Sequence, residues 1–434
     1  MQRIQKTFTV ESIEDFKSKL LIWAQQFEAI SWLDSNQYDQ KYSSFSAVLA
    51  VDEFTSIKTD YTNAFDKLKE YQSITNDYLF GYLSYDLKND VENLSSKNFD
   101  GLDFADLYFF QPQRIILIKG NTVEFSYLKM IDDEIDSDFD SIIAIINEID
   151  TKSSAHDLKI KLRIHKDEYY KKVNSVLNHI HRGDIYEASF CQEFYAENAT
   201  INPLEAYHHL NAISEPPFAT FLKCEHQYLL SASPERYIKK EGTKVVSQPI
   251  KGTAKRLISK VDDAQIAFDL ARDEKERSEN IMIVDLVRND LSKTAIKGSV
   301  KVEELCEVHS FKQVHQLIST VVSEVKDSTN SVDIIRDTFP MGSMTGAPKI
   351  SAMKIIEEEE ETKRGLYSGA VGYFSPCGDF DFNVVIRSIL YNEEKNYVSF
   401  SVGGAITSKS TPEKEYEECL LKAKAMKHVL TNSN

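Results

Sequence analysis

Short apolar runs typical of strands recur along this chain, and amphipathic helices lie between them. Strands are expected at 79–83, 114–119, 185–194, 228–232, 244–250, 369–374, 380–390 and 397–402. Helical spacing is expected at 13–27, 165–181, 263–290 and 413–430, with a possible break at Arg272-Asp273. Strands that cluster in this way with interspersed helices predict an α+β fold that is largely antiparallel.

The composition limits the classes of partner. The chain has 434 residues, of which 42% are hydrophobic, so it can bury a substantial core. Its 68 acidic residues outnumber its 51 basic ones and give a formal net charge of −17. This balance argues against nucleic acid or an anionic membrane as the main partner.

The cysteines and the apolar runs bear on the compartment. The five cysteines are scattered, with no CxxC pair, which favours reduced thiols over a disulfide framework. The first residues lack the apolar core of a signal peptide, and the longest apolar runs are far too short to span a bilayer. We therefore expect a cytoplasmic protein.

Six motifs occur in a fixed order between about residue 160 and about residue 430. They are Ser233-Pro234-Glu235-Arg236, Pro249-Ile250-Lys251-Gly252-Thr253, Arg277-Ser278-Glu279-Asn280, Val284-Asp285-Leu286-Val287-Arg288-Asn289-Asp290, Gly342-Ser343-Met344-Thr345-Gly346-Ala347-Pro348-Lys349 and Glu415-Tyr416-Glu417-Glu418. Together they resemble the chorismate-utilising enzymes, which include anthranilate, aminodeoxychorismate, isochorismate and salicylate synthases. Chance does not readily produce six such motifs in one order.

The resemblance implies a fold and a domain organisation. It implies a layered α/β/β/α sandwich built on two large antiparallel sheets, with which the expected strands are compatible although they do not by themselves predict it. Residues 1–155 would complete the sheets, and residues 156–434 would form the chorismate-binding catalytic region. The two regions are expected to form one intertwined unit.

Lys251 ends an apolar strand and precedes Gly252. A lysine is a nucleophile only when its ammonium loses a proton, which burial or nearby positive charge favours. On spacing alone, Lys-Gly is more simply a solvated turn. The resemblance reverses this balance: alanine marks the anthranilate branch, and lysine marks the branch that forms aminodeoxychorismate. There the lysine is proposed to add to C2 of chorismate while the C4 hydroxyl leaves, and ammonia then attacks C4.

Glu235 is the expected general acid. Hydroxide leaves poorly unless it is protonated, so an un-ionised carboxylic acid is needed near C4. The alternative is a surface glutamate that happens to follow Pro234. The separation of Glu235 from Lys251 matches the family pattern and favours the catalytic role.

Four carboxylates are expected at a magnesium site. The resemblance implies Glu279 and Glu418 as ligands, and Glu276 and Glu415 lie one helical turn before them. Mg²⁺ prefers hard oxygen ligands, and it would offset the repulsion between these groups and a dianionic substrate. Without the resemblance, Glu418 and Lys422 would be a simple pair on a solvated helix.

The remaining expected substrate contacts are spread along the second half of the chain. Arg387 lies in an otherwise apolar stretch, where an arginine is either paired or bound to an anion. By resemblance, the groups that contact chorismate are Arg387 and Tyr373 at the enolpyruvyl carboxylate, the backbone of Gly403, Gly404 and Ala405, Lys422 at a carboxylate, and Ser343, Thr345 and Thr253.

The glycine-containing run that ends in Lys349 invites a nucleotide-binding interpretation. The phosphate-binding loop is GxxxxGK followed by Ser or Thr, whereas this chain has GxxxGxPK, and Pro348 removes a backbone donor. We therefore reject ATP binding here. The run is instead a loop-to-helix turn near the ring, or a plain helix entry.

Three positions depart from the family pattern. Glu187 stands where anthranilate-type members have glutamine and where isochorismate and salicylate synthases have a lysine that activates water, so hydration at C2 is not expected. Gln316 replaces the usual histidine, and the adjacent His315 should point elsewhere. A Leu-Leu-Glu-Ser-type element is not evident, so regulation by tryptophan has no support.

The resemblance implies an enzyme that converts chorismate and ammonia to 4-amino-4-deoxychorismate, on the route to p-aminobenzoate and folate. The sequence contains no glutaminase motif, so ammonia is expected from a separate glutamine amidotransferase subunit in a heterodimer. Two alternatives stay open. One is amination at C2 with loss of pyruvate, as in anthranilate synthase component I, and the other is a non-catalytic relative that keeps the fold.

Overall fold

The computed structural model describes residues 2–38, 41–146, 158–312 and 314–431. The strands are β1 Arg3–Thr9, β2 Ala29–Asp34, β3 Ala47–Thr59, β4 Leu79–Leu83, β5 Leu107–Lys119, β6 Thr122–Leu128, β7 Lys161–Leu162, β8 Glu187–Glu197, β9 Phe218–Cys224, β10 Gln227–Ser233, β11 Arg236–Glu241, β12 Lys244–Gln248, β13 Ile250–Lys255, β14 Lys301–Ser310, β15 Val314–Glu324, β16 Gly346–Ala347, β17 Ala370–Phe374, β18 Phe380–Val384, β19 Ser388–Asn392 and β20 Tyr397–Thr407.

The α-helices are α1 Ile13–Ala24, α2 Ala64–Thr75, α3 Lys88–Val91, α4 Ile135–Ala144, α5 Lys166–Arg182, α6 Pro203–Ser214, α7 Lys260–Leu270, α8 Glu274–Ser292, α9 Ser331–Thr338, α10 Lys349–Glu359 and α11 Pro412–Thr431. Short 3₁₀ helices are η1 Tyr85–Leu87, η2 Lys129–Glu134 and η3 Gly342–Met344. Among the described helices, none is both long enough and apolar enough to cross a bilayer.

The strands form two antiparallel layers that share one pair of long strands. The first layer runs β1, β6, β5, β3, β2, β9, β10, β19, β20 and β8, and β7 and β16 add to β8. The second layer runs β5, β4, β17, β18, β11, β12 and β15, and β13 and β14 also pair with β15. Strands β3 and β5 pass through both layers, with a bulge between Glu53 and Thr55. The predicted antiparallel α+β class is confirmed.

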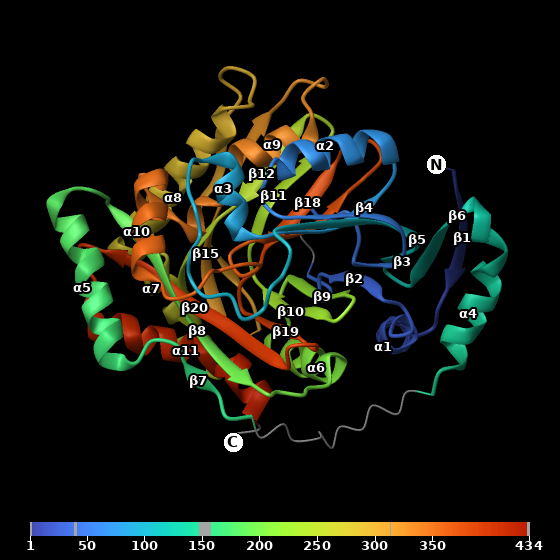
Figure 1. Cartoon of the computed structure of the whole chain (residues 1–434), viewed down its shortest axis with the longest axis horizontal. Helices are drawn as coiled ribbons and strands as arrows, with labels where there is room; N and C mark the ends of the chain where they lie inside the picture. Colours follow the sequence, from blue (N-terminus) through green and yellow to red (C-terminus); the bar gives the residue numbers. More distant parts are fainter. Residues whose placement is uncertain (1, 39–40, 147–157, 313, 432–434) are drawn as a thin grey trace.

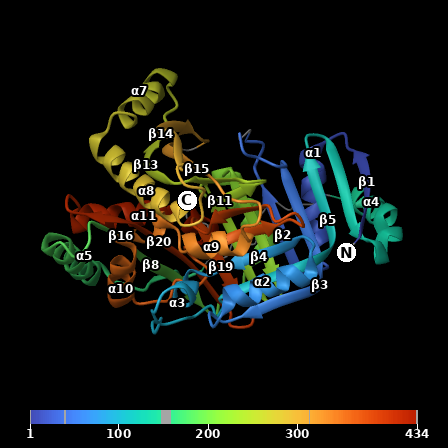
Figure 2. The same ribbon diagram turned by 90° about the horizontal axis from the view of Figure 1, so that it is seen from above.

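Helices cover the outer face of each layer, as Figures 1 and 2 show. Helices α1, α5, α6 and α11 pack on the first layer around buried residues such as Trp32, Phe194 and Phe400. Helices α2, α8 and α9 share a second core with residues between the layers, such as Phe109 and Leu229. Burial of these apolar faces is the main stabilising contribution to such a layered fold.

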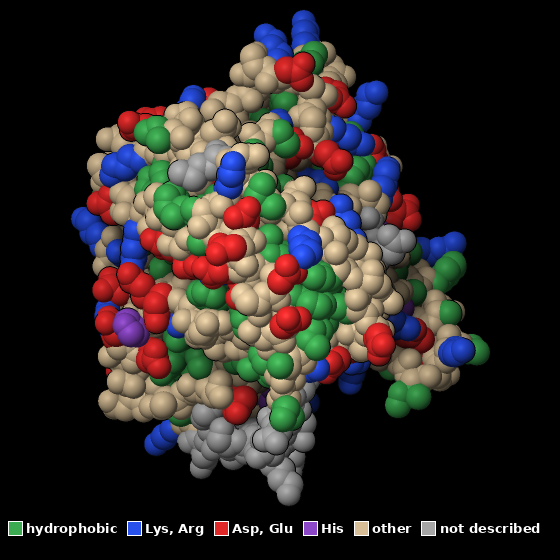
Figure 3. All heavy atoms as spheres, turned by 90° about the vertical axis from the view of Figure 1, so that its right-hand side faces the viewer, with side chains coloured by type: hydrophobic (Ala, Val, Ile, Leu, Met, Phe, Trp, Pro, Cys, Tyr) green, Lys and Arg blue, Asp and Glu red, His purple; other side chains and the backbone are tan. Residues whose placement is uncertain are grey.

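The first third of the chain is inserted among later strands. Strand β2 pairs with both β3 and β9, and β4 pairs with both β5 and β17. The division at residue 155 stays a prediction, and the expected connection at 152–157 lies outside the described residues. Acidic side chains are spread over the face shown in Figure 3, in keeping with the net charge of −17.

One expected helix break is confirmed by the structure, and one expected strand differs from it. The helix expected at 263–290 is broken into α7 and α8, at the position that the sequence suggested, and Asp273 caps α8 by accepting from the N–H of Glu276. The strand expected at 380–390 is two strands, because the chain leaves the second layer after β18 and enters the first layer at β19. Arg387 lies at this crossing with φ of 51° and not within a strand, which corrects the sequence interpretation.

Candidate active site

Lys251 lies on β13, close to several carboxylates. Its Nζ is 3.4 Å from Oε1 of Glu187 on β8, and the two side chains are 13% and 1% exposed. Burial by itself lowers the pKa of Lys251, but the charges of Glu187, Glu279 and Glu235 outweigh it and raise the pKa above its ordinary value. The resting side chain is therefore an ammonium, and it has to pass its proton to a neighbouring group before it can act as a nucleophile.

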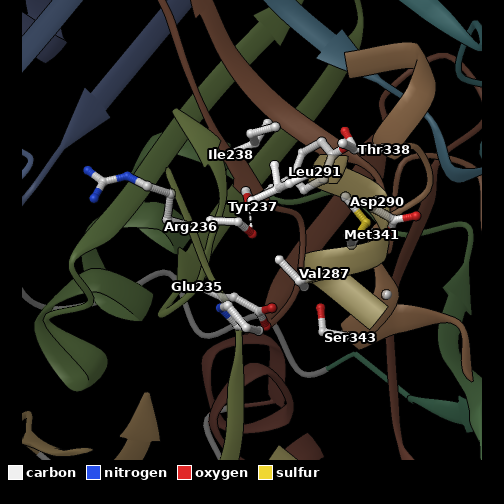
Figure 4. Close-up of a pocket in the computed structure, with 13 residues that line it drawn as sticks. Glu235, Arg236, Tyr237, Ile238, Val287, Asp290, Leu291, Thr338, Met341 and Ser343 are labelled. Atoms are coloured by element: carbon white, nitrogen blue, oxygen red, sulfur yellow. Dashed lines mark hydrogen bonds between the residues drawn. The ribbon is translucent and has the colours of Figure 1, made fainter. Parts of the chain in front are cut away.

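Glu235 lies in the segment where the chain crosses from β10 to β11. It is buried, and burial raises its pKa to about 7, against the opposing effects of a hydrogen bond with Ser343 and the charge of Lys251. Figure 4 shows Glu235 and Ser343 on the wall of one cavity. A carboxylic acid with this pKa is partly protonated at neutral pH, as a general acid requires.

The four expected metal ligands come from two helices. Glu276 and Glu279 lie on α8, and Glu415 and Glu418 lie on α11. Glycines let these helices approach the strands: a Cβ at Gly252 would meet Glu276 Oε2 at 3.1 Å, and a Cβ at Gly404 would meet Glu415 Oε2 at 3.1 Å.

The protonation of these carboxylates reflects burial and mutual repulsion. Burial is the largest effect on Glu279 and raises its pKa to about 7, with Lys275 and Lys251 opposing and Glu276 adding to the rise. Burial likewise raises the pKa values of Glu276 and Glu415. For Glu418, burial is the largest single effect and raises the pKa, but the nearby lysines, chiefly Lys422, together outweigh it and lower the pKa.

Two observations suit these carboxylates to a hard cation: their oxygen ligands, and one buried oxygen that has no hydrogen-bond partner among the described residues. Oε1 of Glu279 is buried with no hydrogen-bond partner among the described residues, and its nearest cation, Lys275, lies 3.6 Å away. A buried carboxylate oxygen in this state is costly unless something coordinates it. Within the described ranges, no three His, Cys, Asp or Glu side chains are close enough together to hold a metal as they stand. The role of these residues as magnesium ligands stays a prediction.

Lys422 connects α11 to the middle of β20. Its Nζ donates to the carbonyl of Gly403 at 2.9 Å and lies 2.7 Å from Glu418 Oε1. Both carboxylate and ammonium are partly exposed, so the pair contributes little to stability and can open to a ligand.

Arg387 has neither an ion pair nor a side-chain hydrogen bond to any described residue. Burial lowers its pKa, and no opposing charge offsets that effect. A guanidinium left in this state is an available site for an anion.

Three further expected substrate residues lie on β17, on β13 and in the turn after η3. Tyr373 faces a second cavity, which it lines with Ser44, Phe45 and Arg236. Thr345 is fully buried, and its hydroxyl donates to the carbonyl of Gly342 within the turn. Thr253 follows Lys251 on β13 with an exposed side chain, opposite Gln316. Their roles as substrate contacts stay predictions.

The run 342–349 forms η3, β16 and the start of α10, with Pro348 as the residue that precedes the helix. Nζ of Lys349 is committed inside the protein, 2.5 Å from Asp290 Oδ2 and 3.2 Å from the carbonyl of Thr338. It is not available to a phosphate, in agreement with the rejection of ATP binding.

Sequence reasoning missed two residues near the cluster. Glu187 was noted only as a departure, yet it is the closest carboxylate to Lys251. Tyr367 carries no motif in the sequence. Its hydroxyl donates to Cys191 Sγ at 3.6 Å, and Cys191 lies directly opposite Gly403 in the sheet. By contrast, His315 points away as expected, toward Asp263 at 3.0 Å.

The family follows from comparison with known sequences. A model of the family described as chorismate binding enzyme matches residues 20–428. The chain belongs to this family.

Two relatives show the range of activities among the chorismate binding enzymes. Aminodeoxychorismate synthase component 1 of Salmonella typhimurium is 41% identical over 265 residues, which cover 61% of this chain and 58% of that protein. The matched region thus spans little more than half of that relative. Anthranilate synthase component 1 of Saccharolobus solfataricus is 30% identical over 430 residues, which cover 96% of this chain and 98% of that protein.

A solved structure supports the fold assignment within the chorismate binding enzymes. Anthranilate synthase component I from Streptococcus pneumoniae superposes with a TM-score of 0.77 at 25% sequence identity. The match covers 90% of this chain and 94% of that one.

Proposed function

We propose that this protein acts as an aminodeoxychorismate synthase component 1, which converts chorismate and ammonia to 4-amino-4-deoxychorismate and water for p-aminobenzoate and folate synthesis. The observation that carries the proposal is that Lys251 and the buried, partly protonated acid Glu235 lie close enough for the charge of each to shift the pKa of the other. A reaction that adds a nucleophile to one carbon while a hydroxyl leaves another needs these two groups together.

In the first half of the reaction, the deprotonated amine of Lys251 forms a bond to C2 of chorismate. The ring double bonds shift, the C4–O bond breaks, and Glu235 donates its proton so that the hydroxyl leaves as water. In the second half, ammonia attacks C4, the double bonds shift back, and the C2–N bond breaks. The new C4 ammonium returns a proton to Glu235, which restores the acid.

The substrate dianion is held by local cations in an otherwise acidic protein. Arg387 would bind one carboxylate, since it has no internal partner in the described structure, and Lys422 would bind the other by opening its exposed pair with Glu418. Glu276, Glu279, Glu415 and Glu418 would hold Mg²⁺, which when bound supplies positive charge beside the ring carboxylate.

Ammonia would be delivered by a separate glutamine amidotransferase subunit. The relatives named component 1 agree with a second component. If the purified chain alone used glutamine as efficiently as ammonium, this part of the proposal would be wrong.

The deciding experiment incubates the purified chain with chorismate, Mg²⁺ and ammonium at mildly alkaline pH, where part of the ammonium is free ammonia. The products are separated by chromatography with mass detection. A product one mass unit lighter than chorismate that keeps its enolpyruvyl group, with nitrogen placed on C4 by NMR, supports the proposal. Anthranilate with released pyruvate would assign the chain to the other branch, which the Saccharolobus relative represents.

A further inference from the structure

We propose that Glu187 is the positioning residue for Lys251 and the group that takes its proton when chorismate binds. This inference rests on the function proposed above and gives a role to a residue that the reaction scheme leaves without one. It concerns the step that produces the nucleophile.

The backbone of Glu187 is held in place by the two strands that pair with it. It begins β8, opposite Thr407 of β20 on one side and Ala347 of β16 on the other. Its side chain is 1% exposed, and Oε1 faces Lys251 Nζ at 3.4 Å. Strands on both sides hold the backbone, so the carboxylate has little freedom to move away from the lysine.

The second carboxylate oxygen of Glu187, Oε2, is available to accept a proton. Oε2 is buried and has no hydrogen-bond partner in the described part of the chain. Lys251 is the one cation within ion-pair distance of Glu187 among the described residues. When the proton moves from Lys251 to Glu187, both side chains become neutral. Neither is then left as an isolated buried charge.

Three other carboxylates influence Lys251, and each has another commitment. Glu235 has to carry a proton to the leaving hydroxyl, so it cannot at the same moment accept one. Glu279 lies 3.6 Å from Lys275, and Glu418 lies 2.7 Å from Lys422. Glu187 is therefore the acceptor that remains.

The proton balance closes over one turnover. The proton moves from the ammonium of Lys251 to Glu187, and the freed lone pair forms the C2–N bond. When ammonia has added at C4 and the C2–N bond breaks, the departing amine takes the proton back from Glu187. No oxidant, reductant or further reactant is needed.

The test compares Glu187→Gln and Glu187→Asp with the wild-type chain. Glu197→Gln is the matched control, because Glu197 ends the same strand, is exposed, and pairs with Lys161 at 2.6 Å far from the cluster. Turnover of chorismate is measured from neutral pH to about pH 10, with free ammonia held constant so that its own titration does not contribute.

We expect Glu187→Gln to lower kcat about 100- to 1,000-fold at neutral pH, with the loss shrinking as the pH rises. Solvent can then deprotonate Lys251 directly. Glu187→Asp keeps the carboxylate at a longer distance, so it should lose less activity and keep the wild-type pH profile. A loss that is equal at every pH, or no loss, would overturn the proposal.

A second measurement needs neither turnover nor chorismate. The rate at which an amine-reactive reagent labels Lys251, followed by peptide mass analysis against pH, reports the pKa of this lysine. Removal of the Glu187 charge should lower that pKa and speed labelling near neutral pH, whereas Glu197→Gln should change neither. Unchanged labelling in Glu187→Gln would overturn the positioning role.

The two measurements separate the two proposals. If the wild-type chain makes no aminated product but labelling responds to Glu187, the proposed function fails and the positioning of Lys251 stands. If the product forms and neither readout responds, the role of Glu187 fails alone.

Discussion

Glu235 and Arg387 lie side by side at the two points where the chain crosses between the layers. The N–H of Val384 donates to the carbonyl of Glu235 at 3.0 Å, and the N–H of Ala232 donates to the carbonyl of Arg387 at 3.1 Å. The first crossing joins β10 to β11, and the second joins β18 to β19. The architecture therefore brings together Glu235 and Arg387, which has no side-chain partner in the part of the chain that the structure describes, although the two are distant in sequence.

Lys251→Ala should abolish amination at C4. We expect kcat to fall by about 1,000-fold or more, because the proposed nucleophile is removed, while chorismate affinity changes only a few-fold. Product analysis measures the first effect and calorimetric binding the second. Lys255→Ala, an exposed position on the same strand, is the control and should behave as wild type. Undiminished C4 amination in Lys251→Ala would exclude covalent catalysis.

Glu235 predicts a pH dependence with a defined sign. Its pKa is raised to about 7, and the general acid works only when protonated, so this group should make kcat/KM decline as the pH rises above about 7. Glu235→Gln should lower kcat about 100- to 10,000-fold and remove this limb of the profile. Profiles taken at constant free ammonia check this. An unchanged limb in the variant would assign the titration to a different residue.

The sequence predicted the motif residues but could not predict how they meet. Glu235, Lys251, Glu279 and Glu418 stand in local patterns that a reader of sequences can find. The crossing at Arg387 was not predicted because apolar residues recur throughout 380–390, and such a pattern does not record which layer a strand joins.

Contacts between strands that are distant in sequence also could not be predicted from the sequence. Tyr373 was expected from the resemblance alone, and nothing in the sequence indicated that its ring would contact Phe45 and Phe80. The approach of Glu187 to Lys251 depends on how two strands of different layers face each other. No local pattern in the sequence carries that information.

Magnesium affinity should increase with pH. Burial raises the pKa of Glu279 to about 7, so below that pH the metal has to displace a proton. We expect the apparent Kd for Mg²⁺ to weaken up to about tenfold per pH unit below about pH 7. Titration calorimetry with the metal alone measures it. Glu279→Gln should weaken binding at all pH values, and exposed Glu274→Gln on the same helix should not. A Kd independent of pH would argue against Glu279 as a ligand.

Arg387→Met should separate stability from substrate binding. Removing a guanidinium that has no partner in the described structure should stabilise the free protein by about 1 kcal/mol. The same change should raise KM for chorismate about 100-fold, because one carboxylate loses its charged partner. Urea unfolding and steady-state kinetics measure the two effects. Arg288→Met, an exposed arginine on α8, is the control and should alter neither. Lower stability together with an unchanged KM would show that Arg387 is a structural residue.

Lys349 should prove structural and not phosphate-binding. It forms a buried ion pair with Asp290 at 2.5 Å, and among the described residues the other cation that pairs with Asp290 is the partly exposed Lys293 at 3.2 Å. Lys349→Met should therefore cost about 3 kcal/mol of unfolding free energy, because it leaves a buried carboxylate poorly compensated. Adding Asp290→Asn removes that charge, so the double variant should recover most of the loss. Urea unfolding of the single and double variants checks both values.

The wild-type chain should show no change in Tm with ATP and Mg²⁺ beyond that seen with Mg²⁺ alone. An ATP-dependent rise that Lys349→Met abolishes would restore the nucleotide interpretation of residues 342–349, against the internal pairing of this lysine.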